Sequence, residues 1–408
     1  MKTISVEKKF WDYIDFKLLI PVLALTFIGF ASIYSATATL PDNNQFENQL
    51  MSFGISIFIL IFFAFTPEKW LHYFSIPIYI IAILLLILTL FLGTSIYGTR
   101  GWIIIAGRSF QPSEIAKLAT LLAVAFIFSN VNVSIKYLQT FLIVLGTFLL
   151  PAILISVQPD FGTATVYFAM LLGILFWSGF NTYALFTILS MPILLLFSLK
   201  GGAFPWIGLG IFTIVSLFFK RKISTTTVAI ALCVAIVFSA PLVYETLQPH
   251  QKARISTFLD PGSNKKDIGY NVAQSVLAVG SGGITGKGYM QGTQTQLRYI
   301  PMQGTDFIFS VPAEEFGLIG SLIVLGLLFY LLQRVFKLAA EVKSRFFNTI
   351  IFGGGCLLLY HTLMNIGMVL GLLPAMGVPL PFMSSGGSAL MTNYAIVGLM
   401  MNGYRSRL

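Results

Sequence analysis

Residues 71–93 read LHYFSIPIYIIAILLLILTLFLG, an apolar run without Asp, Glu, Lys or Arg. A helix needs roughly 20 such residues to cross the hydrocarbon core of a bilayer. Similar runs recur through this chain of 408 residues, of which 56% are hydrophobic and only 10% are charged. This composition excludes an ordinary soluble domain and predicts an all-α polytopic integral membrane protein.

Outward from that run, Pro, Gly and charged residues bound further apolar segments on both sides. Twelve transmembrane helices are expected, near residues 18–37, 49–66, 71–93, 113–129, 137–157, 161–179, 183–199, 203–219, 224–244, 312–333, 347–371 and 385–403. Lys and Arg gather in alternate short loops and at both chain ends, which predicts cytoplasmic termini. Loop 94–112, the large loop 245–311 and the proline-rich turn 372–384 then lie outside.

The net charge of +10 follows the helix ends instead of forming one basic face, so we expect no nucleic-acid partner. Cys233 and Cys356 both lie within apolar runs. They offer neither a disulfide framework nor a metal-ligand spacing.

The most informative acid is Asp306, in the stretch TDFIF that closes the large loop. Phe307 and Phe309 beside it would desolvate its carboxylate and increase its proton affinity, as a general base requires. The alternative is an N-cap acid for the next helix.

Pro312 is better placed than Asp306 to mark the start of that helix. Glu314 and Glu315 would then fall in its first turn, where the helix dipole favours carboxylates. For these two acids a structural role is expected.

The same loop carries a glycine-rich run, GSGGITGKG at residues 280–288. Glycine lets backbone N–H groups approach an anion closely, so Lys287 and the nearby Gln294 are candidate substrate contacts. The run is not a phosphate-binding Walker A loop, because Ser281 replaces the first glycine and Gly288 replaces the Mg²⁺-binding Ser or Thr. A flexible surface loop is the alternative.

Glu114 and Lys117 stand three residues apart on an otherwise uncharged helix, so they share a face and can pair. Charges inside a membrane usually indicate function, although a self-neutralised pair is the alternative. In the outer loop just before them, Arg100 and Arg108 carry guanidinium groups that suit a diphosphate. They could equally be solvated surface charges.

Asp160 lies in the tight external turn QPDFGT, where it either caps the next helix or contacts a ligand. Ser384 and Ser385 lie in an irregular proline-rich segment, which needs a cavity or a re-entrant position. Both serines are candidate substrate contacts. His361 and Asn365 stand four apart on the preceding helix, as helix-packing contacts do.

Taken together, the motifs resemble those of RodA-type members of the SEDS (shape, elongation, division and sporulation) family. They appear in family order over most of the chain: FQPSEIAK (110–117), QPDFGT (158–163), RISTFLDP (254–261), GSGGITGKG (280–288), TDFIF (305–309) and NIGMVLGLLP (365–374). The run from Gly286 to Gln294 favours the elongation type over the division type. The resemblance implies a single SEDS membrane domain over residues 1–408 with a core of ten helices. The surplus pair therefore predicts an inserted transmembrane hairpin at 203–244.

The resemblance further implies a peptidoglycan glycosyltransferase that polymerises lipid II at the outer face of the bacterial cytoplasmic membrane during elongation. Asp306 would be its catalytic base, undecaprenyl diphosphate the leaving group, and Mg²⁺ or Mn²⁺ the cofactor, with no organic cofactor. Expected partners are a class B penicillin-binding protein and the elongation proteins MreC, MreD and RodZ.

Two alternatives remain, a lipid II flippase and a non-catalytic scaffold for a transpeptidase.

Two departures from the family sequence also concern the site. Residues 301–304 read PMQG where the family has Pro-Glu-x-His, so Asp306 would act without an adjacent Glu or His. Ser385 stands where tyrosine is commoner.

Overall fold

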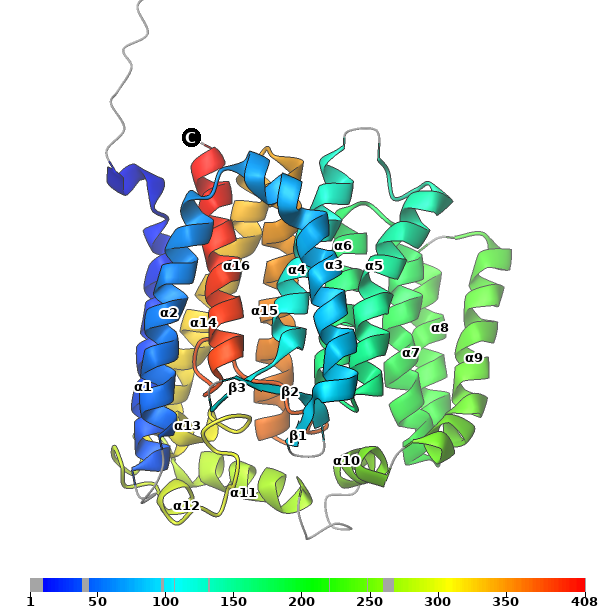
Figure 1. Ribbon diagram of the computed structural model, residues 1–408. Helices are drawn as coiled ribbons and strands as arrows, with labels where there is room; N and C mark the ends of the chain where they lie inside the picture. Colours follow the sequence, from blue (N-terminus) through cyan, green and yellow to red (C-terminus); the bar gives the residue numbers. More distant parts are fainter. Residues whose placement is uncertain are drawn as a thin grey trace, which may run out of the picture. The chain divides into compact units, whose positions relative to one another are not determined.

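The twelve predicted apolar segments are all helical in the computed structural model, which describes residues 10–38, 44–96, 99–105, 107–130, 133–219, 221–247, 249–259 and 268–407. They are α1 (Phe16–Thr37), α2 (Gln45–Phe65), α3 (Glu68–Leu92), α4 (Pro112–Ser129), α5 (Leu138–Val157), α6 (Phe161–Trp177), α7 (Thr182–Lys200), α8 (Phe204–Phe218), α9 (Ile223–Thr246), α14 (Gly317–Glu341), α15 (Arg345–Val369) and α16 (Gly387–Ser406) (Figure 1). A short 3₁₀ helix, Phe10–Tyr13, precedes them.

Nine of the described helices, namely α1 to α5, α7, α9, α14 and α15, are long and apolar enough to cross a bilayer. Two more apolar helices, α6 and α8, are shorter, with 17 and 15 residues. Local sequence sets several helix starts: the side chains of Asp15, Asn181 and Ser344 each accept a backbone N–H from the first turn.

Loop 94–112 contains a small antiparallel sheet that the all-helical prediction missed. Its strands are β1 (Thr94–Ile96), β2 (Thr99–Ile105) and β3 (Arg108–Phe110), in the order β1-β2-β3. The run Ile103–Ile105 is β-branched and therefore suits a strand. Gly107, at φ +77°, supplies the left-handed turn between β2 and β3.

The large loop 245–311 is partly helical, with α10 (Pro249–Leu259), α11 (Ile268–Ser281) and α12 (Thr293–Gln296) inside it and α13 (Ser310–Glu315) at its end. The prediction for Glu314 and Glu315 was wrong in detail, because both end α13 and do not lie in the first turn of α14. Gly317, at φ +61°, separates the two helices. A Cβ at this position would lie 2.5 Å from the backbone nitrogen of Gly286, so only glycine lets the loop pack there.

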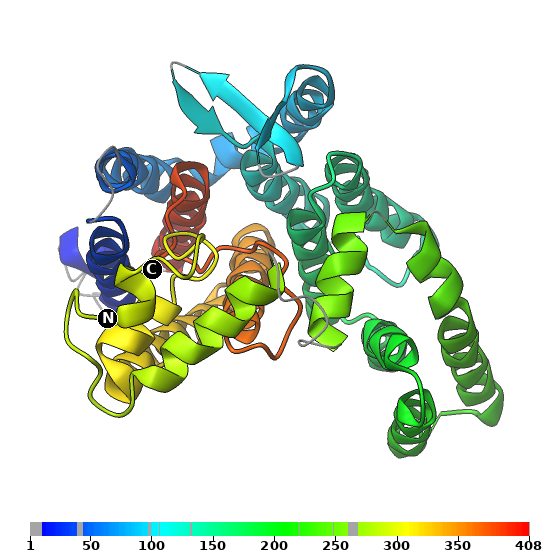
Figure 2. The same cartoon turned by 90° about the horizontal axis from the view of Figure 1, so that it is seen from below.

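The chain forms two compact units, residues 1–174 with 271–408, and residues 175–270. Within the first unit α4 and α15 pack against each other and are the most buried spans, each 72% buried. The sheet, α12 and α13 lie at one end of this unit's helices, the lower end in Figure 1, and the C-terminus lies at the other. Seen from that lower end, the segment between α15 and α16 runs across the helix ends beside the loop that precedes α13 (Figure 2).

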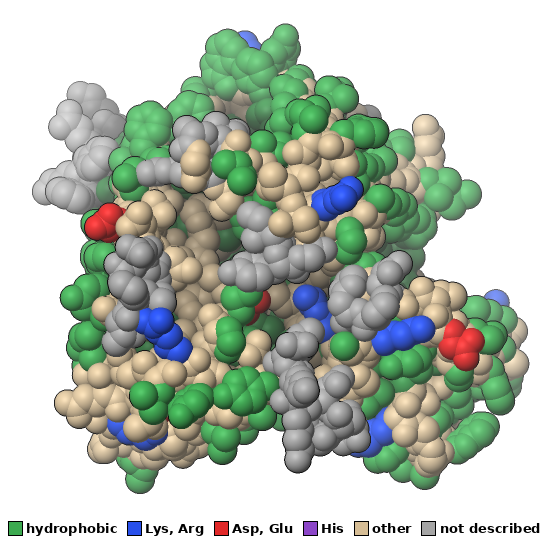
Figure 3. Space-filling view, turned by 60° about the horizontal axis from the view of Figure 1, so that its bottom comes forward, with side chains coloured by type: hydrophobic (Ala, Val, Ile, Leu, Met, Phe, Trp, Pro, Cys, Tyr) green, Lys and Arg blue, Asp and Glu red, His purple; other side chains and the backbone are tan. Residues whose placement is uncertain are grey.

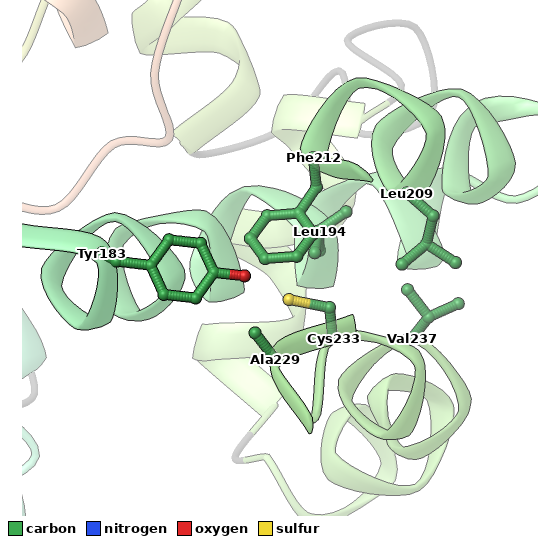
Figure 4. Close-up of a cluster of buried hydrophobic side chains, with 7 residues drawn as sticks. All are labelled: Tyr183, Leu194, Leu209, Phe212, Ala229, Cys233 and Val237. Carbon is green, nitrogen blue, oxygen red and sulfur yellow. The ribbon is translucent and has the colours of Figure 1, made fainter. Parts of the chain in front are cut away.

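The second unit has its own core where α7, α8 and α9 meet (Figure 4). Its buried side chains are Tyr183, Leu194, Leu209, Phe212, Ala229, Cys233 and Val237. The hydroxyl of Tyr183 points toward the sulfur of Cys233. This core is apolar except for those two groups.

An ion-pair network joins three distant parts of the first unit at the end that carries the C-terminus. Arg334, late in α14, bonds to Asp15 at the start of α1 at 2.6 Å and to Glu341 at 3.4 Å. Glu341 also pairs with Arg407. The start of α1, the end of α14 and the C-terminal residues are therefore held together.

Candidate functional site

Asp306 is held in place by α15 and by the proline-rich segment that follows it. The side-chain nitrogen of Asn365 donates to the backbone oxygen of Asp306 at 2.7 Å and to that of Val378 at 2.8 Å. A Cβ added to Gly377 would lie 3.5 Å from Oδ2 of Asp306, so the carboxylate lies against this glycine. Asp306 is partly exposed, while Phe307 and Phe309 are buried as expected.

Ser384 and Ser385, predicted substrate contacts, bind the backbone next to Asp306. Ser384 Oγ donates to the oxygen of Thr305 at 2.7 Å and accepts the N–H of Leu380 at 2.8 Å. The N–H of Ser385 donates to the oxygen of Gly304 at 2.9 Å. These serines therefore fix the main chain that carries the acid.

Gln49, a residue that the sequence analysis did not select, fixes the same turn from α2. Its Nε2 donates to the oxygen of Ser384 at 3.2 Å, and its Oε1 accepts the N–H of Gly386 at 3.0 Å. Gln49 is one of several polar residues at the start of α2, so nothing in the sequence distinguished it. Asp306 thus depends on residues from α2, α15 and the proline-rich segment.

Glu114 and Lys117 form the ion pair that their spacing predicted. Lys117 Nζ lies 2.8 Å from Glu114 Oε1, and the side chains are only 2% and 4% exposed. The second carboxylate oxygen of Glu114 is buried and has no partner among the described atoms. A charge pair this deeply buried is costly to keep, so it must be held by its surroundings.

Asp160 caps α6, which is the structural alternative. Its Oδ1 accepts the N–H of Thr163 at 3.1 Å, and its Oδ2 accepts the hydroxyl of Thr163 at 2.8 Å and Nε2 of Gln111 at 3.0 Å. Arg100 is exposed on β2. Arg108 begins β3, and its side chain lies outside the described residues.

Lys287 of the glycine-rich run and the segment that follows the run bind a carboxylate of the chain itself, that of Glu314. Lys287 Nζ lies 2.7 Å from Glu314 Oε1, and the N–H groups of Gln294 and Thr295 donate to the two carboxylate oxygens at 2.9 Å each. Burial alone would raise the pKa of Glu314, but these hydrogen bonds together hold its pKa below the ordinary value of 4.5. Lys287 and Gln294 are thus committed to an internal clamp.

Backbone contacts tighten this clamp. The N–H of Gly288 donates to the oxygen of Glu315 at 2.9 Å, and a Cβ on Gly286 would lie 2.1 Å from that same oxygen. The Glu315 carboxylate accepts the hydroxyl of Ser35 at the end of α1. Burial raises the pKa of Glu315. The loop is therefore packed on α13 and α1, and the flexible-loop alternative does not describe it.

Gln303, within the PMQG departure, joins this part of the loop to α1. Its Nε2 donates to the oxygen of Ala36 at 2.8 Å. A Cβ on Gly304 would lie 3.2 Å from Oε1 of Gln45, so the chain passes close to α2. Gln303, within this departure from the family pattern, thus helps to position the loop on α1.

Among the described residues, no three His, Cys, Asp or Glu side chains lie close enough to form a metal-binding group. This part of the chain therefore contains no preformed ligand set for the expected divalent cation. On the face that carries the loops, the visible Lys and Arg side chains lie as separate spots (Figure 3).

Known proteins resemble the chain over almost its whole length. The family model of FtsW, RodA and SpoVE, described as cell cycle proteins, matches residues 14–201 and 206–407. The second range runs through most of the hairpin 203–244, so the match does not set that hairpin apart. The peptidoglycan glycosyltransferase MrdB of Escherichia coli (strain K12) is 33% identical over 97% of this chain and 95% of its own.

The peptidoglycan glycosyltransferase RodA of Treponema pallidum is 30% identical over 95% of this chain and 96% of its own. Among solved structures, a chain from a peptidoglycan synthase complex that coordinates polymerization and crosslinking is similar with a TM-score of 0.72. It is 28% identical and covers 96% of this chain and 98% of its own. The crystal structure of Thermus thermophilus RodA gives a TM-score of 0.62 at 25% identity, over 96% of this chain and 97% of its own. The chain is a multi-pass membrane protein that belongs to the FtsW/RodA/SpoVE family.

Proposed function

We propose that the chain is a peptidoglycan glycosyltransferase that polymerises lipid II into β-1,4 glycan strands, with Asp306 as its general base. The names of its relatives support the enzyme class. One observation carries the role of Asp306. This acid is partly exposed at one end of the first unit, while its backbone is fixed by Asn365 and by Ser384 through the adjacent Thr305.

This geometry suits proton abstraction. A general base must reach its substrate and hold a defined position, and both conditions are met by a partly exposed acid on a fixed backbone. The next residues in the chain include Phe307 and Phe309, which are buried, so the acid adjoins an apolar part of the loop. Its electrostatic interaction with a reacting hydroxyl is stronger in such surroundings.

In the proposed reaction, Asp306 takes the proton of the 4-hydroxyl of the acceptor GlcNAc. The hydroxyl oxygen then bonds to the anomeric carbon of the donor MurNAc, with inversion. The bond from that carbon to the diphosphate breaks, and undecaprenyl diphosphate leaves with the bonding electron pair. Exposed Arg100 is a candidate for binding the diphosphate.

The test is a polymerisation assay with purified protein and lipid II. Asp306→Asn keeps the size of the side chain and removes its basicity, so glycan synthesis should fall to background. The matched control is Glu245→Gln, which neutralises an exposed acid in the second unit and should leave the rate unchanged. Normal glycan length from Asp306→Asn would overturn the assignment.

The two alternatives predict other outcomes, each with its own measurement. If the chain were a scaffold, cells should still grow when Asp306→Ala is expressed at normal levels. A flippase would move lipid II between leaflets without making polymer. The structure gives little support to the flippase alternative, because the charges that suggested it, Glu114 and Lys117, neutralise each other.

The partner and the orientation belong to the same proposal. The similar chain from a peptidoglycan synthase complex supports a partnership with a class B penicillin-binding protein. We place the Asp306 end of the first unit outside the cytoplasmic membrane and both termini in the cytoplasm, as the positive-inside rule predicts. Reporter fusions at residues 100 and 407 would test this, and the same reporter signal at both positions would contradict it.

Dependence on Mg²⁺ or Mn²⁺ is also part of the proposal. Mg²⁺ often binds through one or two carboxylates plus substrate phosphates, so a preformed protein site is not required. Chelation with EDTA should then stop polymerisation, and added Mg²⁺ or Mn²⁺ should restore it. Full activity after exhaustive chelation would contradict this dependence.

A further inference from the structure

Several polar side-chain atoms where α4 meets α15 are buried without a hydrogen-bond partner among the described atoms. They are Ser113 Oγ and Glu114 Oε2 on α4, and Asn365 Oδ1 and both ring nitrogens of His361 on α15. His361 is 1% exposed and Asn365 is fully buried. Buried polar groups in proteins are nearly always paired, and an unpaired group is costly. These atoms therefore need further partners.

The atoms belong to two helices that pack against each other. His361 and Asn365 are one turn apart on the same face of α15. On α4, Lys117 is bonded to Glu114 at 2.8 Å. Since α4 and α15 pack directly against each other, a small ligand between them could contact residues of both helices.

Water is the ligand whose chemistry fits. A neutral imidazole has one donor and one acceptor nitrogen, while Asn365 Oδ1 and Glu114 Oε2 only accept. Water donates and accepts, and a buried water molecule makes roughly three hydrogen bonds. A metal cation does not suit the site, because the carboxylate of Glu114 is already paired with Lys117. Substrate groups are excluded because Glu114, Lys117, His361 and Asn365 are each at most 3% exposed.

We propose that bound water molecules fill this polar contact between α4 and α15, and that they hold Asn365 in the orientation that positions Asp306. Asn365 donates to the backbone oxygens of Asp306 and Val378, at 2.7 and 2.8 Å. A water molecule that donates to Oδ1 would add a third hydrogen bond to the amide group and so prevent its rotation. Asn365 and His361 are then positioning residues, because neither reaches the substrate. This inference rests on the proposed role of Asp306.

The first experiment needs no variant. X-ray radiolysis of the wild-type protein generates hydroxyl radicals from water and oxidises side chains beside bound water molecules, which mass spectrometry then locates. His361 should be oxidised several-fold faster than Phe148, a reactive ring with the same 1% exposure in an apolar helix. Equal, slow oxidation of His361 and Phe148 would overturn the water site.

The second experiment measures polymerisation of lipid II by variants. Asn365→Leu and His361→Phe remove the polar atoms and should lower kcat at least tenfold with little change in KM, because substrate contacts are intact. His361→Gln keeps a donor and an acceptor and should recover most of the rate. The control is Thr362→Val, since the Thr362 hydroxyl bonds only to Leu358 of its own helix. Wild-type kcat in Asn365→Leu would overturn the positioning role.

Failure of this inference differs from failure of the proposed function. If Asp306→Asn is inactive while Asn365→Leu and His361→Phe polymerise normally, the positioning role fails alone. If Asp306→Asn is fully active, the proposed base fails, and radiolysis still decides whether water is bound.

Discussion

The α4–α15 pair and the α7–α9 group are both built from apolar helices, yet they bury different kinds of residues. The spanning windows of α4 and α15 are 72% buried, whereas those of α7 and α9 are 22% buried. The α4–α15 pair encloses an ion pair, a histidine and an asparagine. Three hydroxyl groups of α7 and α8, those of Thr187, Ser190 and Thr213, bond to the fourth preceding residue of their own helix, and Ser198 of α7 bonds to the backbone of α9.

The difference separates two uses of a membrane-embedded helix. A hydroxyl that bonds to its own helix costs little in lipid and carries no information about function. A charged or amide side chain usually needs a partner outside its own helix. The free-energy cost of burying it in the membrane is high, so its presence usually indicates function. The pair α4–α15 therefore supports the proposed site at Asp306, while the α7–α9 group is stabilised chiefly by apolar packing.

The largest effect is expected from Lys117→Met. This change leaves the buried Glu114 carboxylate without its partner and should cost about 3–5 kcal/mol. Thermal unfolding in detergent measures the loss. The double variant Glu114→Gln/Lys117→Met removes both charges and should recover most of the stability. If Lys117→Met is as stable as the wild type, the pair is not the centre of the α4–α15 contact.

A second large effect should come from Leu194→Ala, within the α7–α9 core. Truncation of a buried leucine leaves a cavity and costs about 2–5 kcal/mol. Leu194 is 2% exposed, whereas Leu189 on the same helix is 53% exposed, so Leu189→Ala is the matched control. We expect lower thermal stability but retained polymerisation at low temperature. Complete inactivity of a folded Leu194→Ala protein would weaken the contrast between the two regions.

A smaller effect is expected from Lys287→Met, about 1–3 kcal/mol, because Lys287 is partly exposed. The pKa of Glu314 lies below 4.5 in the folded protein, so its stabilising contribution is complete above 4.5 and disappears as the pH falls through its folded pKa. Without Lys287 the folded pKa of Glu314 should be closer to its ordinary value, so the loss of stability in acid should be smaller and should be complete at a higher pH. Unfolding temperature against pH measures it, with exposed Lys343→Met as the control. Identical pH profiles would exclude the clamp.

The smallest effect should come from Phe218→Ala on α8, whose side chain is 79% exposed. We expect a change below about 0.5 kcal/mol. Phe212→Ala on the same helix is the contrasting variant, because Phe212 is 3% exposed and stacks on Phe186. Equal losses from the two variants would show that both faces of α8 are packed.

The sequence predicted the twelve helices well because the apolar runs are long and bounded by Pro, Gly or charge. It missed the small sheet at Thr94–Phe110, where the strands are short and pair only with one another. It also placed Glu314 and Glu315 in the wrong helix. The break before α14 depends on the approach of Gly286 to Gly317, which are distant in the sequence.

The candidate site divides in the same way. Spacing alone predicted the Glu114–Lys117 pair, because residues three apart on a helix are neighbours. It could not show that the segment after the glycine-rich run would bind Glu314, or that Ser384 and Asn365 would fix the backbone at Asp306. These contacts join residues 20 to 79 positions apart.

The sequence by itself determined a membrane protein with twelve apolar helices, an ion pair on α4 and a carboxylate at Asp306, because hydropathy and helical spacing are local properties. Only the tertiary structure decided what surrounds that carboxylate. Hydrogen bonds from Asn365 and Ser384 form when α15 and the proline-rich segment fold over the loop. The reason is that buried polar groups must find partners wherever the fold brings them, and sequence distance does not constrain that choice.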